Sequence, residues 1–251
     1  MNNIKTKVYA IVQARMSSTR LPGKVMKKIV GKPMLELMIE RLKYCKELSG
    51  IIIATTHNDA DQPIVDLVNS LNGILLFRGS EEDVLSRYHG AAVMYNAETI
   101  VRVTSDCPVI DPVVLDKIVN VYHEKAGTID YASNIRERTY PRGLDVEVFS
   151  FAALDRAFKE ATLQPDREHV TEYILQRPEE FRMYDVVDKS DNNSLRWTVD
   201  TQEDFALITK IYEALYMSQP DFKYHDILKL LEKYPEWNLI NAHIEQKVYG
   251  Q

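Results

Sequence analysis

Four short apolar runs in the first part of the chain constrain its fold more than any other feature. They are KVYAIVQ (7–13), GIIIAT (50–55), GILLF (73–77) and TIVRVT (99–104), and β-branched residues are frequent in them. Runs of this length and composition predict strands that are buried on both faces. We therefore expect an α/β fold, in which helices sandwich a mostly parallel, Rossmann-like sheet.

The segments between these runs repeat apolar residues at helical spacing. PMLELMIERLKYC (33–45) carries an apolar stripe and opens with a proline, which suits a first helical position. Similar stripes run through residues 64–71 and 84–92. DPVVLDKIVNVYHEK (111–125) predicts a fourth helix with Asp111 as its N-cap. These stripes are typical of core packing and need no cofactor to explain them.

The pattern changes after about residue 130. DYASN (130–134), LDVEVFS (144–150) and FRMYDVV (181–187) predict strands of another sheet, and DREHVTEYILQR (166–177) predicts a helix among them. We interpret residues 130–195, approximately, as a small inserted β-rich subdomain. LRWTV (195–199) predicts a last strand before a further helix. Because no linker or repeat divides residues 1–251, we expect a single domain with this insertion.

The charge balance and the cysteine content exclude several classes of protein. The formal net charge is −6, which argues against a broad basic surface for nucleic acid but not against a local basic pocket. Cys45 and Cys107 are too few for a disulfide framework, and no zinc-site spacing occurs. No apolar run is long enough to span a bilayer, and the first residues lack a signal-peptide pattern. We expect a cytoplasmic protein with no membrane partner.

The stretch QARMSSTRLPGK (13–24) follows the first apolar run directly. It combines Arg15, Arg20 and Lys24 with three hydroxyl side chains and a Pro-Gly pair. Ligands of open α/β sheets bind beyond the carboxyl ends of the strands, and guanidinium, ammonium and loop N–H groups bind phosphates. The alternative is a solvated surface loop of simple turns. The position and density of these groups favour a triphosphate site, although neither common glycine-rich phosphate motif is present.

This loop resembles the signature of the cytidylyltransferases that activate acidic sugars. RVTSDCPVIDP (102–112) and RWTVDTQEDF (196–205) lie where that family has metal-binding aspartates. PRGLDVEVFS (141–150) and REHVTEYI (167–174) are similar to the branch of spore-coat polysaccharide biosynthesis protein F, which fits better than the 3-deoxy-manno-octulosonate branch. The resemblance covers residues 7 to about 210 and implies a sheet of the nucleotide-diphospho-sugar transferase type.

The resemblance implies a Mg²⁺-dependent reaction that transfers CMP from CTP to a sugar, acidic sugar or sugar-phosphate-like acceptor and releases pyrophosphate. The pathway would be surface polysaccharide or glycoconjugate synthesis. Asp106 and Asp200 would bind the metal, and the catalytic residues would be Arg15, Lys24 and Asp106. Asp200 has a structural alternative, because with Glu203 three residues on it could simply cap the following helix.

Two further sets of residues are expected to bind the substrates. The nucleotide would contact Gln13, Ala14, Arg15, Ser18, Arg20, Lys24, Thr55 and Ser80. The acceptor would contact Arg142, Asp145, Glu147 and His169. Ser80 could instead form a capping box with Asp83, and this turn departs from the Ser-Gly-Thr-Asp-Arg-like turn of the deoxyoctulosonate enzymes, which leaves base selectivity open. Arg142 would suit an anionic acceptor. The two acids could be plain strand residues that face water, and no residue stands out as a general base.

Two other functions remain compatible with the sequence. One is a glycosyltransferase that uses a nucleotide sugar, with SDCP (105–108) as its metal-binding motif, but the usual Asp-x-Asp pair is absent and STRLPGK would be unexplained. The other is a non-catalytic nucleotide-binding protein of the same fold. We expect a homodimer, because twofold dimers are the commonest assembly and the resemblance implies that the inserted region pairs the subunits.

Overall fold

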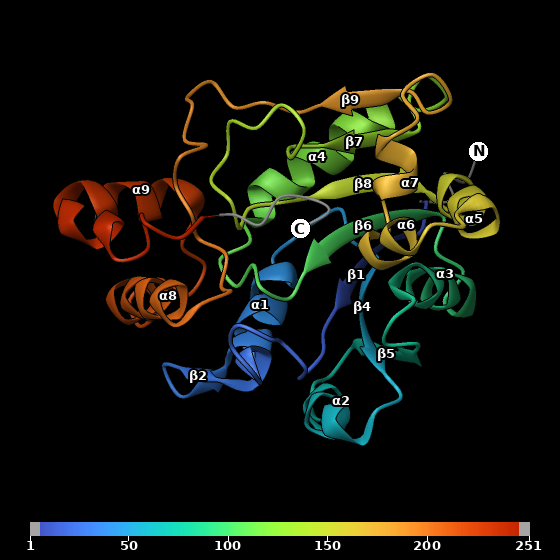
Figure 1. Ribbon diagram of the computed structural model, residues 1–251. Coiled ribbons are helices and arrows are strands. Elements are labelled where there is room, and N and C mark those ends of the chain that lie inside the picture. The colour runs from blue at the N-terminus through green and yellow to red at the C-terminus, as the bar shows by residue number, and fades with distance from the viewer. Residues whose placement is uncertain (1–5, 246–251) are drawn as a thin grey trace.

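A seven-stranded sheet forms the centre of the computed structural model, which describes residues 6–245 (Figure 1). Its strand order is β5-β4-β1-β6-β8-β7-β9. All neighbouring strands are parallel except that β8 runs antiparallel to both β6 and β7. The strands are β1 (Val8–Gln13), β4 (Gly50–Thr56), β5 (Ile74–Gly79), β6 (Thr99–Thr104), β7 (Tyr131–Ser133), β8 (Glu147–Ser150) and β9 (Met183–Asp185). The predicted α/β class is therefore confirmed, and the four apolar runs are β1, β4, β5 and β6.

The strands after residue 130 extend this sheet. The prediction of another sheet is wrong, because β8 pairs with β6 in the register Arg102↔Glu147 and β7 and β9 follow it outward. The predicted strand at 195–199 is also wrong. This segment forms only an isolated bridge between Arg142 and Arg196, and its N–H groups at Trp197 and Val199 donate to loop carbonyls.

Helices cover both faces of the sheet (Figure 1). Side chains alternate along β1, so that Ala10 and Val12 face one apolar core while Ile11 faces the other. The first core includes α1 (Met34–Leu42), α2 (Gln62–Ser70), α4 (Pro112–Glu124), α8 (Gln202–Leu215) and α9 (Tyr224–Lys233). The opposite side carries α3 (Val84–Met94), α5 (Phe151–Glu160), α6 (Gln164–His169) and α7 (Glu172–Leu175). No helix within residues 6–245 is long and apolar enough to cross a membrane.

Short elements complete the chain. A hairpin of β2 (Lys28–Ile29) and β3 (Lys32–Pro33) precedes α1, which begins one residue later than predicted, with Pro33 at its N-cap. The 3₁₀ turns are η1 (Lys24–Met26), η2 (Asp59–Asp61) and η3 (Pro235–Leu239). The predicted cap of α4 is confirmed, since Asp111 Oδ1 accepts hydrogen bonds from the N–H groups of Val113 and Val114 at 2.7 and 3.2 Å.

The predicted helix over 166–177 is wrong as a single element. It is divided into α6 and α7 at Val170, whose φ of 64° and ψ of −58° are not helical. The N–H of Thr171 donates to the carbonyl of His169 at 2.7 Å, which closes a γ-turn around Val170. Helical spacing of apolar residues continues across the break, so the sequence pattern does not reveal it.

A close backbone approach holds the segment before α8 in place. Gly143 has a φ of 104°, and a Cβ at this position would lie 2.5 Å from the carbonyl carbon of Trp197. Only glycine combines this conformation with this lack of space. The segment that follows Trp197 lies beside the end of β6, where Val199 N–H donates to the carbonyl of Asp106 at 2.8 Å. Two acidic residues distant in sequence, Asp106 and Asp200, thereby come together.

Candidate active site

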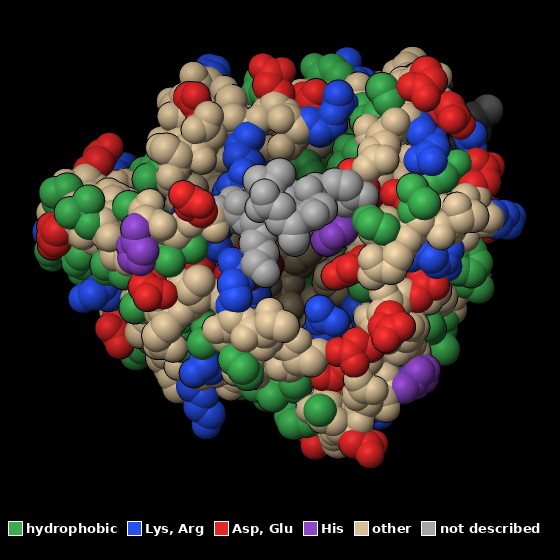
Figure 2. Space-filling model, viewed as in Figure 1, with side chains coloured by type: hydrophobic (Ala, Val, Ile, Leu, Met, Phe, Trp, Pro, Cys, Tyr) green, Lys and Arg blue, Asp and Glu red, His purple; other side chains and the backbone are tan. Residues whose placement is uncertain are grey.

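A cavity of about 240 Å³ opens at the carboxyl ends of β1 and β6. Its walls come from the loop after β1, the loop after β6, the segment before α8, and the helices α3 and α6. On the face shown in Figure 2, basic side chains and a histidine surround a hollow near the centre. Ligands of open α/β sheets occupy this position, so the fold itself favours a binding site here.

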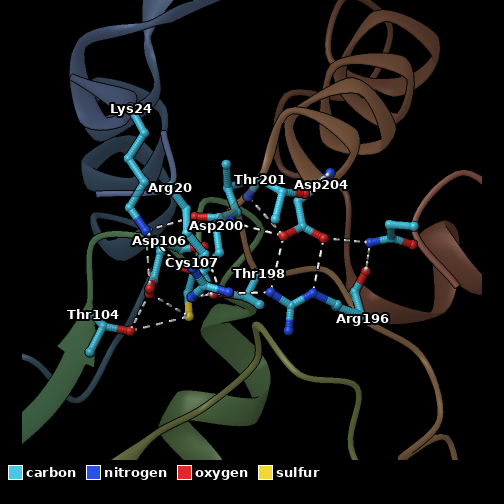
Figure 3. A network of polar contacts seen from close by, with 12 residues as sticks. Arg20, Lys24, Thr104, Asp106, Cys107, Arg196, Thr198, Asp200, Thr201 and Asp204 are labelled. Carbon is cyan, nitrogen blue, oxygen red and sulfur yellow. Dashed lines mark hydrogen bonds and ion pairs between the residues drawn. The ribbon is translucent and has the colours of Figure 1, made fainter. Parts of the chain in front are cut away.

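Lys24 lies at the centre of a polar network in this cavity (Figure 3). Its Nζ is 2.9 Å from Asp200 Oδ1, 3.4 Å from Asp106 Oδ2 and 2.7 Å from the carbonyl oxygen of Val199. Burial acts to lower the pKa of Lys24, but the two carboxylates outweigh burial and raise it. The side chain is therefore a fixed positive charge between two acids.

Asp200 belongs to the cavity and not to the helix cap. Its Oδ2 atom also forms an ion pair with Nη2 of Arg20 and accepts a hydrogen bond from Nη2 of Arg196, each at 2.9 Å. Burial acts to raise the pKa of Asp200, but Lys24 and the two guanidinium groups hold it below its usual value. The N-cap of α8 is Thr201, which forms a capping box with Asp204, so capping by Asp200 and Glu203 is wrong as an alternative.

Asp106 pairs with one cation, whereas Asp200 pairs with three. Its Oδ1 accepts a hydrogen bond from Thr104 Oγ1 at 2.5 Å and lies 3.6 Å from the thiol of Cys107, while its Oδ2 faces Lys24. Burial strongly raises the pKa of the Cys107 thiol, so that neighbour is neutral. Asp106 thus retains lone pairs that can coordinate a cation.

Comparison with known proteins identifies this arrangement. The family model described as Cytidylyltransferase matches residues 9–247. The chain belongs to the cytidylyltransferase family. It is 38% identical over 247 residues to an uncharacterized protein of Methanocaldococcus jannaschii, with 98% of each chain covered. It is 30% identical to spore coat polysaccharide biosynthesis protein SpsF of Bacillus subtilis, over 90% of this chain and 94% of SpsF.

Solved structures agree with this assignment. A cytidylyltransferase from Leptospira borgpetersenii is 33% identical and superposes with a TM-score of 0.89, covering 97% of this chain and 99% of its own. The complex of CMP:2-keto-3-deoxy-manno-octonic acid synthetase with CTP shares the fold, with a TM-score of 0.62 at 18% identity over 83% of this chain and 99% of its own. The resemblance seen in the sequence is confirmed, and the chain is a nucleotidyltransferase.

The two carboxylates in the cavity of this cytidylyltransferase suit a magnesium ion that takes its other ligands from a substrate and from water. Mg²⁺ is commonly held by one or two carboxylates together with phosphate oxygens and water. Asp106 and Asp200 supply two carboxylates beside a cavity rich in cations. Within residues 6–245 no group of three or more His, Cys, Asp or Glu side chains could hold a metal ion. A metal here would therefore depend on the nucleotide for its remaining ligands.

A buried ion pair behind Asp200 was missed at the sequence level. Asp204 accepts hydrogen bonds from Arg196 Nε at 2.9 Å and from Asn241 Nδ2 at 2.8 Å, and it also accepts from the backbone N–H of Asp200 at 3.0 Å (Figure 3). Arg196 in turn binds the Asp200 carboxylate. This pair orients a cavity residue from behind. Its signal in the sequence was present, since both members lie within RWTVDTQEDF.

Most of the predicted nucleotide contacts line the cavity. Those that do are Gln13, Ala14, Arg15, Ser18, Arg20 and Lys24. Arg15 is half-exposed and its guanidinium lies 3.5 Å from Glu81, so it is not part of the Lys24 network. The loop after β1 is anchored at its start, where the N–H of Met16 donates to Asp61 Oδ1 at 2.7 Å.

Thr55 and Ser80 do not line the cavity. Thr55 is fully buried in β4. The hydroxyl of Ser80 accepts a hydrogen bond from the N–H of Asp83 at 3.0 Å, and Asp83 itself caps α3 by accepting from Ser86 N–H at 2.9 Å. Ser80 is therefore part of the turn before the cap, and the alternative of a capping box with Ser80 as N-cap is wrong.

Of the predicted acceptor contacts, His169 alone lines the cavity as the structure describes it. Asp145 forms a bidentate ion pair with Arg138, at 2.5 and 3.2 Å. Arg142 is partly buried, and burial together with the charge of Arg138 lowers its pKa. These two residues come from the loop before β8 and lie outside the cavity lining.

Glu147 is placed in the protein interior. It is 3% exposed, and its carboxylate accepts hydrogen bonds from Tyr131 at 2.7 Å and from Thr171 at 2.6 Å and pairs with Arg102. Its environment does not support direct acceptor binding. The alternation of DVEV suggested an outward-facing acid, but helices cover both faces of the sheet at this point.

Several cavity residues were not predicted. They are Thr19, Val84, Arg87, Thr104, Ser105 and Glu168. Arg87 follows Val84 by three positions, a helical spacing that in this segment indicated only core packing. Glu168 precedes His169 at the end of α6, directly before the helix break at Val170, and both residues line the cavity.

Proposed function

We propose that the chain is a metal-dependent cytidylyltransferase that transfers CMP from CTP to a sugar, acidic sugar or sugar-phosphate-like acceptor. The observation that carries the proposal is the convergence of Lys24, Asp106 and Asp200 at one cavity. Cations and two carboxylates, one of them paired with a single cation, are the groups that bind a metal–triphosphate complex.

The reaction replaces the phosphoanhydride bond between the α- and β-phosphates of CTP by a bond from the α-phosphorus to the acceptor. An acceptor oxygen attacks the α-phosphorus of CTP, the bond from this phosphorus to the bridging oxygen breaks, and pyrophosphate leaves. A bound Mg²⁺ would neutralise the triphosphate and align its α-phosphate. Lys24 and Arg20 lie beside the two carboxylates and are placed to stabilise charge on the departing pyrophosphate. Arg15 can join them once a triphosphate competes with Glu81.

The acceptor would be bound by the region from about 130 to 195. His169 lines the cavity, and Arg142 is a partly buried cation next to Arg138, a setting that attracts an anionic group. The name of SpsF supports a pathway of polysaccharide synthesis. Because CTP is a cytoplasmic metabolite, we place the enzyme in the cytoplasm.

The same region would also pair two subunits as a homodimer. β9 is the last strand in the order of the sheet, and Tyr184 and Val187 are each 39% exposed along and just after it. An open strand edge with apolar side chains is a natural contact surface. The molar mass in solution, measured by light scattering, tests this arrangement, and a monomer at micromolar concentration would refute it.

Pyrophosphate release tests the proposed function. The enzyme is incubated with each of the four ribonucleoside triphosphates and Mg²⁺ across a panel of acidic sugars, neutral sugars and sugar phosphates, and parallel reactions contain a chelator. We expect release that requires CTP, acceptor and metal and that is lost in Asp106→Asn. Binding of CTP is measured separately by calorimetry. If no nucleoside triphosphate binds in the presence of Mg²⁺, the proposal is wrong.

A further inference from the structure

An incompletely paired arginine is buried in the wall of the same cavity. Arg87, on α3, is 2% exposed. Its Nη1 donates to the carbonyl of Ser80 at 2.6 Å, but its Nε is buried and has no hydrogen-bond partner in the part of the chain that the structure describes. Within residues 6–245 no acidic side chain forms an ion pair with it. A buried cation without an anion or sufficient acceptors is costly, so a ligand is expected to supply what is missing.

The other two buried arginines have more partners within the protein. Arg41 donates to the carbonyls of Ile110 and Phe222, at 2.7 and 2.8 Å, and stacks on the ring of Phe222, although its Nη1 has no hydrogen-bond partner within residues 6–245. Arg196 binds two carboxylates. Neither of them lines the cavity. Arg87 therefore combines unused donor capacity with access to a ligand.

The surroundings of Arg87 are built to hold it in this position. A Cβ at Gly79, the last residue of β5, would lie 3.2 Å from Arg87 Cγ and 3.1 Å from the ring of Phe77. The glycine thus leaves room for the arginine stem. The start of α3 is fixed by its cap, Asp83, which also pairs with Arg167 at 2.7 Å.

An unpaired acceptor lies on the same side of the sheet. The Oε1 atom of Gln13 is buried and has no hydrogen-bond partner within residues 6–245. Side chains alternate along β1, so Gln13 faces the same side as Ile11, which packs with α3. Val84 of α3 adds an apolar wall to the cavity. An acceptor, several donors and an apolar surface are together the features that bind a flat heterocycle.

We propose that Arg87 and Gln13 recognise the cytosine ring of CTP, with Arg87 donating to O2 and N3 and Gln13 accepting from the N4 amino group. This inference rests on the proposed function. Uracil presents an acceptor, O4, at position 4 and a donor, N–H, at position 3. Its O4 would face the acceptor oxygen of Gln13, and its N3–H would face the donor groups of Arg87, so both contacts would be unfavourable. A phosphate group suits this position less well, because the unpaired Gln13 acceptor would face it.

Equilibrium binding tests the inference without any knowledge of the acceptor. Calorimetry with Mg²⁺ compares CTP, UTP and inorganic tripolyphosphate on the full-length protein and on Arg87→Met, Arg87→Lys and Gln13→Met. We expect Arg87→Met to weaken CTP binding at least tenfold, to bring the affinities for CTP and UTP together, and to leave tripolyphosphate binding unchanged. Gln13→Met should reduce the preference for CTP over UTP. Arg78→Met is the matched control, since Arg78 lies in β5 outside the cavity lining.

Each other result overturns the inference. If Arg87→Met weakens the binding of tripolyphosphate as much as the binding of CTP, the arginine binds phosphate. If the variant binds CTP like the wild type, Arg87 does not contact the nucleotide. Methionine keeps most of the buried stem and removes the buried charge, so the thermal midpoint should not fall and loss of binding cannot be attributed to unfolding. Should the wild type bind CTP without preference over UTP, the proposed function survives and only this inference fails; should it bind none of the three probes, both fail.

Discussion

The ammonium group of Lys24 lies between two carboxylates, Asp106 and Asp200, that are distant from each other along the chain. Removing it affects the two acids unequally. Asp200 keeps Arg20 and Arg196, and Asp106 keeps the hydroxyl of Thr104. Because neither acid is left without a partner, the fold should tolerate the loss of Lys24 much better than the chemistry does.

Lys24→Met is therefore expected to separate activity from stability. Turnover of CTP, with the acceptor that the panel identifies, should fall by about 10²- to 10³-fold, which is the usual effect of removing one charge-stabilising donor. The thermal midpoint should change by no more than a few degrees. Lys28→Met is the control, since Lys28 is an exposed lysine four residues further on. Activity within tenfold of the wild type would remove Lys24 from the catalytic residues.

At the residue scale, sequence reasoning predicted that Lys24, Asp106 and Asp200 converge, and they do, while their roles stay predictions. The place of Asp106 follows from the end of β6, but Asp200 was expected to follow a strand over 195–199 and instead follows a loop segment that hydrogen bonds to Asp106. Glu147 could not be placed in the same way. Whether an acid within a strand faces water or a buried partner depends on what covers the sheet, and Arg102 and Thr171 reach it from other elements.

The γ-turn between α6 and α7 is a strained element beside the cavity. Its central residue, Val170, is β-branched and fully buried and has a φ of 64°. Residues other than glycine rarely adopt this backbone conformation, which costs on the order of 1–3 kcal/mol. The hydroxyl of Thr171 fixes the turn by donating to the buried carboxylate of Glu147. His169 lines the cavity immediately before this turn.

Glycine and alanine at position 170 should reverse their usual order of stability. Both substitutions remove the buried isopropyl group, but only glycine relieves the positive φ. We expect Val170→Gly to be about 1 kcal/mol more stable than Val170→Ala. Urea unfolding measures the difference. At Val119, buried in the interior of α4, the same pair should show the normal order, with alanine more stable by about 1 kcal/mol. The same order at both positions would mean that the turn carries no strain.

At the element scale, the sequence predicted helices and strands well where one periodic pattern met a clear boundary. The four strands of the apolar runs and the cap of α4 are examples, although β5, expected to be buried on both faces, is an edge strand that is only partly buried. The break at Val170 was missed because valine gives no signal for a positive φ, and tertiary contacts impose it. The segment 195–199 has the composition of a strand, but the close approach of Gly143 to Trp197 leaves it in a loop.

At the scale of the whole molecule, the main error was to separate the region after residue 130 from the sheet. Short strands following an α/β pattern can form a new sheet or extend the old one, and local sequence does not distinguish the two. Here β8 pairs with β6. As a result, the region expected to bind the acceptor is continuous with the region expected to bind the nucleotide.

Asp204 connects segments that are distant along the chain. It is fully buried and binds Arg196 in the segment before α8, the backbone N–H of Asp200 beside the cavity, and Asn241 after η3. Burial acts to raise the pKa of Asp204, but the hydrogen bonds from Arg196 and Asn241 outweigh burial and lower it. The folded protein therefore favours the ionised form more than the unfolded chain does.

Asp204→Asn should consequently destabilise the protein in a manner that depends on pH. A group whose pKa is lowered by folding contributes stability above its unfolded value, near 3.9, and loses it as the pH falls through the folded value. At pH 7 we expect a loss of about 3 kcal/mol, because the substitution leaves a buried arginine with one partner fewer. Urea unfolding in chelator, at several pH values from 7 to 3, should show the difference between wild type and variant shrink only below about pH 4. A difference that stays constant down to pH 3 would mean that packing, and not the charge of Asp204, joins these segments.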